Sequence, residues 1–554
     1  EVSAHTKDIH FLAWTTTPWT LPSNTALTVG PAIDYALVST FNQYTYEPIT
    51  VILAKNLIGY QFSKGFEAKE SIAELSSYEA GLKVIPYVVL GSVQGKDLLG
   101  FSYEQLLPYA LPAENPEKAF VVIPGDFVTT EDGTGIVHTA PTFGADDAKV
   151  AADAGVPAML VHDDRGNLVP LVDLQGRFRP EMGEFAGMYV KNEYYNEGEE
   201  PDRSADVQIA IKLKEENKAF KVEKYEHNYP HCWRTDKPVL YYPLDSWFIR
   251  VTDKKDRMVA LNQTIQWKPE STGTGRFGKW LENANDWNLS RSRYWGIPIP
   301  IWSTEEGDER ICIESVEQLK AECDKAVSAG IMETNPLADF ESGNMSAENY
   351  AQIDLHKHRV DAITLVSPSG KAMKREADLI DVWFDSGSMP YAQWHYPFEN
   401  KELIENRTGY PADFIAEGVD QTRGWFYTLH VLATALFDRP SFASCVSHGI
   451  VLGDDGAKMS KSLRNYPDPM AVFDSHGADA LRWYLLSSPI LRGGDFSVTE
   501  VGMRDTVRQV LLPMWNSYYF LSLYANAENK SGTVRTDSTN VLDRYVLAKL
   551  ADTI

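Results

Sequence analysis

Short apolar runs separated by turn residues dominate the first 240 residues of this 554-residue chain. Runs with the length and β-branched content of strands lie at 9–15, 35–40, 48–54, 84–90, 119–123 and 135–139. Glycine and proline punctuate the intervals between them, which is typical of a barrel-like or sandwich-like β domain. Residues 207–213 alternate like a strand, but the Lys, Glu and Ala around them favour a helix. We therefore expect a mainly β domain with inserted helices.

The second half of the chain alternates strand-like and helix-like segments from about residue 376. A short strand is predicted at 413–416, a helix at 425–436, and another strand at 445–452. Open α/β sheets bind ligands at the carboxyl ends of their strands. The polar residues that follow the two strands are therefore candidates for a binding site.

Helical spacing appears beyond residue 500, and its large apolar positions are expected to form the core of a helical bundle. They are Val507, Val510, Leu511, Met514, Trp515, Tyr518, Phe520 and Leu521. Residues 306–375 are polar and charged and are predicted to form a small inserted subdomain.

Composition narrows the class of protein. The length exceeds what one core supports, and 44% apolar residues exclude global disorder. No apolar run is long enough to predict a membrane span. A net charge of −25 argues against phosphate binding by the whole surface, although Arg291-Ser292-Arg293 forms a local basic patch. Four scattered cysteines without a C-x-x-C pair predict neither disulfides nor zinc, and favour a reducing cytoplasm.

Residues 453–462 (GDDGAKMSKS) carry the most specific signal in the chain. Glycines permit unusual backbone angles, and lysine ammonium groups are natural partners for phosphate oxygens. Such a loop suits the binding of a triphosphate, with Lys461 as the first candidate and Lys458 as the second. The string KMSKS resembles the second signature of class I aminoacyl-tRNA synthetases.

Other segments extend this resemblance to the isoleucyl members of that family. They are WTTTPWTLPSN at 14–24, GTGIVHTAP at 133–141 and DFIAEGVDQTRGWF at 413–426. Thr17-Pro18 stands where the valine and leucine enzymes typically carry Arg-Pro. The family's HIGH motif is absent, so we expect the chain to be a fragment that begins in or near the editing insertion.

The resemblance implies an editing site that hydrolyses mischarged tRNA. Such hydrolysis needs a placed water and support for an oxyanion. The implied residues are Thr15, Thr16, Thr20, Asn24, His138 and Asp147. Asp147 would hold the substrate's ammonium group, and His138 would limit the size of the side-chain pocket. Each role has a structural alternative. The threonines could simply form a strand, Asp147 could be a helix N-cap, and His138 could be a packed structural histidine.

The resemblance also implies an aminoacyl-adenylate site. Its residues would be Glu417, Gly418, Asp420, Gln421, Trp425 and His448, with Lys458 and Lys461 on the ATP phosphates. Glu417 would accept the amino acid's ammonium group, and Asp420 and Gln421 would hold the ribose. Trp425 would face the aliphatic side chain, and His448 would neighbour the nucleotide. Core packing of Trp425 and burial of His448 remain open alternatives.

The expected fold is multidomain α/β: the second part of a Rossmann-like nucleotide fold, a β-barrel-like editing domain and the start of an α-helical anticodon-binding domain. The predicted divisions are 1–235 (editing), 236–305 (return to the catalytic core), 306–375 (insertion), 376–450 (Rossmann-like), 451–499 (KMSKS loop) and 500–554 (helical).

The implied reaction is ATP-dependent activation of isoleucine, transfer to tRNA(Ile), and hydrolysis of valyl-tRNA(Ile). Mg²⁺ is expected with ATP as substrate, and no protein-bound metal or zinc is predicted. A cytoplasmic monomer is expected. A valine–tRNA ligase, a stand-alone editing hydrolase and a non-catalytic RNA-binding paralogue are the alternatives.

Overall fold

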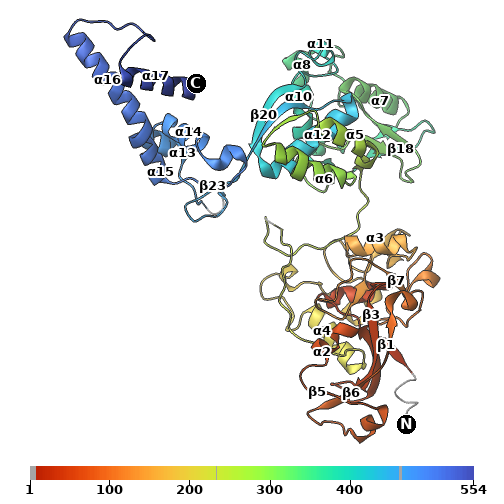
Figure 1. Cartoon of the computed structure of the whole chain (residues 1–554). Helices are drawn as coiled ribbons and strands as arrows, with labels where there is room; N and C mark the ends of the chain where they lie inside the picture. Colours follow the sequence, from red (N-terminus) through yellow and green to blue (C-terminus); the bar gives the residue numbers. More distant parts are fainter. Residues whose placement is uncertain (1–7, 233, 461–463) are drawn as a thin grey trace. The chain divides into compact units, whose positions relative to one another are not determined.

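The computed structural model describes residues 8–232, 234–460 and 464–554 (Figure 1). It divides into two compact units, Glu1–Asp245 and Ser246–Ile554, here called unit 1 and unit 2. Among the described residues, no helix combines the length and the apolarity that crossing a bilayer requires. None of the four cysteines, all of which lie within the described residues, forms a disulfide.

The larger sheet of unit 1 has five strands in the order β1-β4-β3-β6-β5. These are β1 (Ile9–Phe11), β4 (Pro48–Ala54), β3 (Asp34–Phe41), β6 (Ile85–Gln94) and β5 (Phe66–Ala68). β3 runs antiparallel to both of its neighbours. Val38, Val51 and Leu53 are fully buried in the apolar core beside this sheet, because strand residues two apart share one face.

A three-stranded sheet in unit 1 carries part of the candidate site. Its order is β7 (Val121–Pro124), β2 (Ala26–Val29) and β8 (Ile136–Thr139), with β2 parallel to β7 and antiparallel to β8. Helix α3 (Ala145–Asp153) follows β8 and packs Ala151 against Ala26 and Ile123. The remaining regular elements of the unit are α2 (Ile58–Gln61), β9 (Leu160–His162), β10 (Leu168–Pro170) and α4 (Ala205–Glu215).

Most predicted elements of unit 1 are confirmed. The predicted strands at 35–40, 48–54, 84–90, 119–123 and 135–139 correspond to β3, β4, β6, β7 and β8. The helix predicted at 207–213 is α4, where Ala205, Ile209 and Leu213 are buried at a spacing of four residues. Residues at that spacing lie on one face of a helix. The burial therefore follows the helical pattern and not the strand-like alternation of residues 207–213.

The strand predicted at 9–15 is wrong beyond Phe11. Trp14 forms only an isolated bridge with Val137, and a 3₁₀ helix occupies Pro18–Ser23. Pro18 fixes φ at the first helical position and has no N–H to give to a sheet. The threonine-rich segment is therefore a folded turn.

Residues 266–448 of unit 2 contain a parallel sheet in the order β12-β21-β20. The strands are β12 (Gln266–Lys268), β21 (Phe442–His448) and β20 (Ala412–Gly418), and α12 (Trp425–Phe437) connects β20 to β21. The predicted strand at 413–416 and helix at 425–436 are confirmed. Every residue from 426 to 434 is buried, as expected for a helix that is apolar on all sides.

The strand predicted at 445–452 is interrupted in the structure. β21 ends at His448, and β22 (Val451–Leu452) pairs in a separate sheet with β23 (Phe496–Ser497). At Gly449 a Cβ would lie 2.0 Å from the Gly494 carbonyl oxygen. This close backbone approach needs glycine and marks where the chain leaves the parallel sheet.

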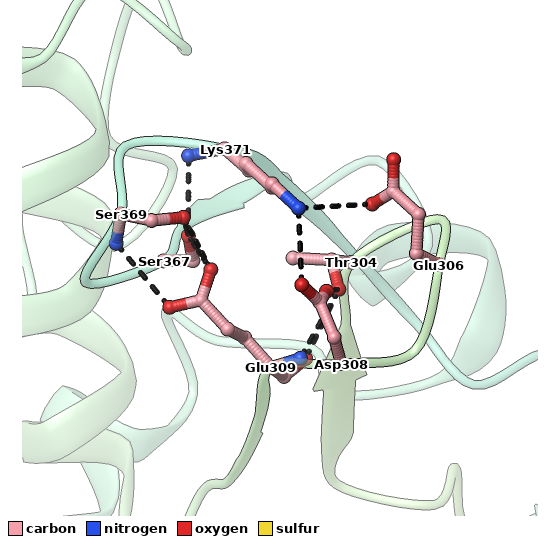
Figure 2. A network of polar contacts seen from close by, with 7 residues as sticks. All are labelled: Thr304, Glu306, Asp308, Glu309, Ser367, Ser369 and Lys371. Atoms are coloured by element: carbon pink, nitrogen blue, oxygen red, sulfur yellow. Dashed lines mark hydrogen bonds and ion pairs between the residues drawn. The ribbon is translucent and has the colours of Figure 1, made fainter.

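A small four-stranded sheet lies within residues 301–375, in the order β16-β15-β18-β17. The elements of this region are β15 (Ile301–Ser303), β16 (Arg310–Cys312), α7 (Val316–Ser328), α8 (Ala347–Tyr350), α9 (Lys357–Val360), β17 (Leu365–Val366) and β18 (Ala372–Arg375). Figure 2 shows polar contacts between the β15–β16 turn and the β17–β18 turn. Ser367 Oγ donates to Glu309, and Lys371 Nζ lies 3.0 Å from Asp308 Oδ2. These contacts tie one turn to the other.

Short helices and two-stranded sheets complete the first part of unit 2. They are α5 (Lys255–Asn262), α6 (Gly278–Glu282), β11 (Phe248–Ile249) with β13 (Trp287–Asn288), β14 (Ser290–Arg291) with β19 (Leu379–Ile380), α10 (Val382–Ala392) and α11 (Lys401–Glu405). Trp267, Phe277 and Phe442 lie in a core that α5, α6 and β13 share with α12.

Helices dominate residues 469–554: α13 (Pro469–His476), α14 (Ala478–Leu486), α15 (Glu500–Thr506), α16 (Leu512–Ala527) and α17 (Val541–Thr553). The predicted burial of the aromatic stripe is wrong in this structure. Trp515, Tyr518 and Phe520 are 65%, 66% and 64% exposed. Helical spacing predicts an apolar face, but burial also needs a packing partner, and the described residues leave this part of α16 exposed.

Candidate functional site

The threonine-rich turn of unit 1 is folded upon itself by its own hydroxyl groups. Thr15 Oγ1 accepts the Thr17 N–H at 3.1 Å, and the Thr20 hydroxyl donates to the Thr17 carbonyl at 2.9 Å. The backbone N–H of the buried Trp19 donates to Asp206 Oδ1 on α4 at 2.8 Å. The alternative that these threonines serve as strand formers is wrong, because they shape a compact polar turn.

Five of the six predicted editing residues line one cavity of about 300 Å³. Thr15, Thr16 and Thr20 come from the turn, His138 from β8 and Asp147 from α3. The sixth predicted residue, Asn24, lies behind this wall and contacts His138 directly. The structure therefore brings together residues more than a hundred positions apart in the sequence.

His138 is buried and engaged at both ring nitrogens. Asn24 Nδ2 lies 2.8 Å from Nδ1, and Thr20 Oγ1 lies 3.0 Å from Nε2. An amide NH₂ can only donate, so Nδ1 is the acceptor and Nε2 carries the hydrogen. Burial lowers the pKa of His138 from 6.5 to about 4. At neutral pH the side chain is thus uncharged and donates its Nε2–H to Thr20, which lines the cavity.

Asp147 occupies the first turn of α3, where helix N–H groups and the helix dipole favour a negative charge. The Ala140 N–H donates to its Oδ2 at 2.8 Å. Burial raises the pKa of Asp147, while this hydrogen bond opposes the shift. Gly144 is the N-cap residue, so the N-cap alternative for Asp147 is wrong.

Sequence reasoning missed Trp14 and Thr17 as cavity residues and Tyr103 as the partner of Asn24. The glycines at 133–135 could have indicated that a large side chain, here Trp14, packs closely against this segment. Gly133 has a φ of +69°, and a Cβ there would lie 3.0 Å from the Trp14 ring. A left-handed glycine beside a tryptophan of another segment permits this close wall.

The predicted adenylate residues of unit 2 gather at the carboxyl ends of β20 and β21. Gly418 pairs with His448 in the parallel register, and Glu417 is exposed beside it. A Cβ at Gly418 would lie 2.6 Å from Asp420 Oδ1. Glycine therefore keeps space open at the strand end, where α/β sheets bind ligands. His448 is half-buried, and its Nδ1 donates to the Gly449 carbonyl at 2.7 Å.

Gln421 and Trp425 have structural contacts as well. Gln421 Oε1 accepts the Trp425 N–H at 2.9 Å at the start of α12, which leaves the Gln421 NH₂ as a donor. The Trp425 indole N–H donates to the Ser386 carbonyl at 2.9 Å, and the ring is partly buried against the core. Core packing of Trp425 is thus part of its role here.

Lys458 is brought to the adenylate residues. Its Nζ lies 3.0 Å from Asp420 Oδ2, and both side chains are exposed. An exposed pair of this kind stabilises the fold by about 0–1 kcal/mol, so a stronger anionic partner would displace it readily. Lys461 lies outside the described residues.

The family model for tRNA synthetases class I (I, L, M and V) matches residues 17–497. The chain belongs to the class I tRNA synthetases. This membership shows the multidomain α/β class, while the residue roles and the six domain divisions stay predictions.

Several curated class I synthetases are similar to nearly the whole chain. Isoleucine–tRNA ligases from Bacteroides fragilis, Cytophaga hutchinsonii and Mycobacterium tuberculosis are 54%, 56% and 47% identical over 98% of the chain. The aligned part is 49%, 48% and 46% of those proteins. The chain therefore spans about half the length of the curated relatives it matches.

A solved LeuRS–tRNA–LeuAMS ternary complex from Agrobacterium radiobacter K84 is also similar. The matched region is 87% of this chain and 47% of the matched chain, with 17% sequence identity and a TM-score of 0.29.

Proposed function

We propose that this chain contains the editing domain and the second part of the nucleotide fold of an isoleucine–tRNA ligase. The whole protein would activate isoleucine with ATP, transfer it to tRNA(Ile) and hydrolyse valyl-tRNA(Ile). The cavity of unit 1, with its threonine turn, His138 and Asp147, carries the proposal. Identities of 47–56% to isoleucine–tRNA ligases support the choice of amino acid.

The editing cavity offers what ester hydrolysis requires. The Asp147 carboxylate would bind the aminoacyl ammonium group by a charge-assisted hydrogen bond. The hydroxyls of Thr15, Thr16 and Thr20 would position water and the ester. His138 has a pKa of about 4 and donates its Nε2–H to Thr20 Oγ1, so it would stay neutral and hold the Thr20 hydroxyl in place beside the ester. A water oxygen would then attack the carbonyl carbon of the ester, and the bond from that carbon to the tRNA ribose oxygen would break. One proton of the water would pass to the ribose oxygen, which gives free valine and a tRNA hydroxyl.

A second site is needed because valine and isoleucine differ by one methylene. Such a difference changes binding in an apolar pocket by only about 1–3 kcal/mol, a magnitude for which the isoleucine enzymes are themselves the standard example. A cavity that accepts the smaller side chain and excludes the larger one multiplies the discrimination.

In unit 2 we propose that Glu417 binds the ammonium group of isoleucine and that Asp420 and the Gln421 NH₂ bind the ribose. Lys458 and Lys461 would contact the phosphates of ATP, with Trp425 and His448 beside the adenylate. Among the described residues, no group of three His, Cys, Asp or Glu side chains is placed to share a metal ion. We propose that Mg²⁺ enters with ATP, held mainly by phosphate oxygens.

Finer aspects of the fold and setting belong to the same proposal. Unit 1 would be a β-barrel-like editing domain, and the helices beyond residue 500 would begin the anticodon-binding domain. The complete enzyme would be a cytoplasmic monomer. A valine–tRNA ligase and a stand-alone editing hydrolase remain as second candidates; Thr17-Pro18 and the relatives disfavour the former, and the KMSKS loop disfavours the latter.

The ligase assignment is tested by joining this chain to its natural upstream coding sequence and measuring ATP–pyrophosphate exchange. Isoleucine should support exchange with a kcat/KM at least about 100-fold above that for valine and far above that for leucine. Exchange that is fastest with valine would establish the valine enzyme instead. No exchange with any amino acid, despite a folded protein, would contradict the ligase assignment.

A further inference from the structure

A series of hydrogen bonds runs from the partly buried Tyr103 of unit 1 to the cavity. The Tyr103 O–H donates to Asn24 Oδ1 at 2.5 Å, and Asn24 Nδ2 donates to His138 Nδ1 at 2.8 Å. His138 Nε2 then donates to Thr20 Oγ1 at 3.0 Å, and the Thr20 hydroxyl donates to the Thr17 carbonyl. His138 and Thr20 line the cavity, whereas Asn24 and Tyr103 lie behind it.

The direction of these hydrogen bonds follows from which of the side-chain groups can donate and which can accept. Asn24 Nδ2 is surrounded by acceptors, since the Ala26 carbonyl lies at 2.8 Å and the Thr139 carbonyl at 3.3 Å. Its Oδ1 faces Tyr103, which is held protonated because burial raises the pKa of its phenol. The amide therefore has one favoured orientation. In that orientation Nδ1 of His138 can only accept, and its hydrogen must reside on Nε2.

Resting on the proposed editing function, we propose that Tyr103 is a positioning residue of the deacylation site. By donating to Asn24 Oδ1 it fixes the Asn24 amide, and the amide holds His138 as the Nε2–H tautomer that donates toward the cavity. Tyr103 does not line the cavity, so it acts through two intervening side chains, Asn24 and His138. The histidine's environment thereby selects its tautomer, as is usual for imidazoles.

The backbone around Tyr103 explains how it is held. Its N–H donates to the Phe120 carbonyl at 2.9 Å, and its ring packs edge-on against Phe120 at 6.1 Å between centroids. The next residue along from Phe120 begins β7, which pairs with the β2 strand that follows Asn24. Tyr103 and Asn24 are thus fixed to the same small sheet, which makes their contact a built feature of the domain.

The test compares Tyr103→Phe with Tyr194→Phe in the full chain. Tyr194 is a matched control, because its hydroxyl also donates to one acceptor, the Pro238 carbonyl at 2.7 Å, and does not line the cavity. The ring-nitrogen chemical shifts of ¹⁵N-labelled His138 report the tautomer at neutral pH, with His138→Gln assigning the signals. Deacylation of valyl-tRNA(Ile) is measured in the same samples.

In the parent chain we expect a protonated Nε2 and a bare Nδ1. Tyr103→Phe should shift both signals toward their average and slow deacylation about threefold to tenfold. Tyr194→Phe should change neither the shifts nor, beyond about twofold, the rate. Unchanged His138 signals in Tyr103→Phe would overturn the inference, whatever happens to the rate.

A second variant guards against loss of folding. Asn24→Asp presents only acceptor oxygens to His138, so Nδ1 should become protonated; a bare Nδ1 in this variant would also overturn the inference. If the parent chain does not cleave valyl-tRNA(Ile), the editing proposal fails, and the nitrogen signals still decide the role of Tyr103.

Discussion

Replacing Asp147 with asparagine is the sharpest perturbation of the candidate editing site. Asparagine keeps the size of the side chain and one acceptor oxygen for the Ala140 N–H, which lies 2.8 Å from Oδ2 in the parent chain. The substitution therefore removes the charge with little change in packing. Hydrogen bonds to a charged group contribute about 1.5–3 kcal/mol, so losing the ammonium partner should lower kcat/KM about 10- to 100-fold.

The assay is single-turnover deacylation of valyl-tRNA(Ile) by the full chain, with Asp146→Asn as the matched control. Asp146 precedes Asp147 in the same turn of α3, is exposed and does not line the cavity. It should reproduce the general change in charge without the specific loss, and should stay within about twofold of the parent. Equal rates for Asp147→Asn and Asp146→Asn would refute the anchoring role of Asp147.

Three further predictions concern Asp147, His138 and Gly418. Because burial raises the pKa of Asp147, deacylation should fall on acidification already above the ordinary carboxyl value of 3.8, and a rate profile of the parent chain from pH 7 to pH 4 checks this. His138 stays neutral in the folded state down to about pH 4, whereas the unfolded chain binds a proton below pH 6.5, so unit 1 should lose up to about 3 kcal/mol of stability between these values. His138→Gln should remove that loss, and denaturant unfolding at pH 7 and pH 4.5 compares the two proteins; an identical loss in both would contradict the assignment. Gly418→Ala in the ligase joined to its upstream half should lower ATP–pyrophosphate exchange at least about tenfold, because its Cβ would lie 2.6 Å from Asp420 Oδ1. Gly532→Ala, where an added Cβ would meet nothing within 4 Å, is the control for the effect of a glycine-to-alanine change on folding. Exchange that survives Gly418→Ala unchanged would remove the strand end from the adenylate site.

Local pattern was enough to predict the elements whose periodicity and length agree. β4 spans Pro48–Ala54 as predicted, and α12 begins at Trp425 as predicted. The failures occur where a single residue or a tertiary contact overrides the pattern. Pro18 converts a predicted strand into a turn, and the close approach of Gly449 to Gly494 divides another strand.

The members of the candidate editing site were predicted from motifs, whereas their connections were not. Thr20 and His138 are 118 residues apart, and Asn24 and His138 are 114 apart. Neither spacing carries a local periodic signal, so only the pairing of β2 with β8 brings these side chains together. Tyr103 lies outside every recognised motif, and its role follows from geometry alone. The exposed aromatic stripe of α16 shows the converse, a clear pattern without a partner in the described residues.

We propose that the cavity of unit 1 removes valine from tRNA and spares isoleucine, and the ratio of two deacylation rates decides this. Valyl-tRNA(Ile) and isoleucyl-tRNA(Ile) are incubated separately with the full chain, and the first single-turnover rate is divided by the second. We expect the valyl ester to be hydrolysed faster by at least about tenfold, as follows from exclusion of one methylene. We also expect His138→Ala to lower the ratio by admitting the isoleucyl ester. Equal hydrolysis of both esters by the parent chain, or hydrolysis of neither, would contradict the proposed editing function.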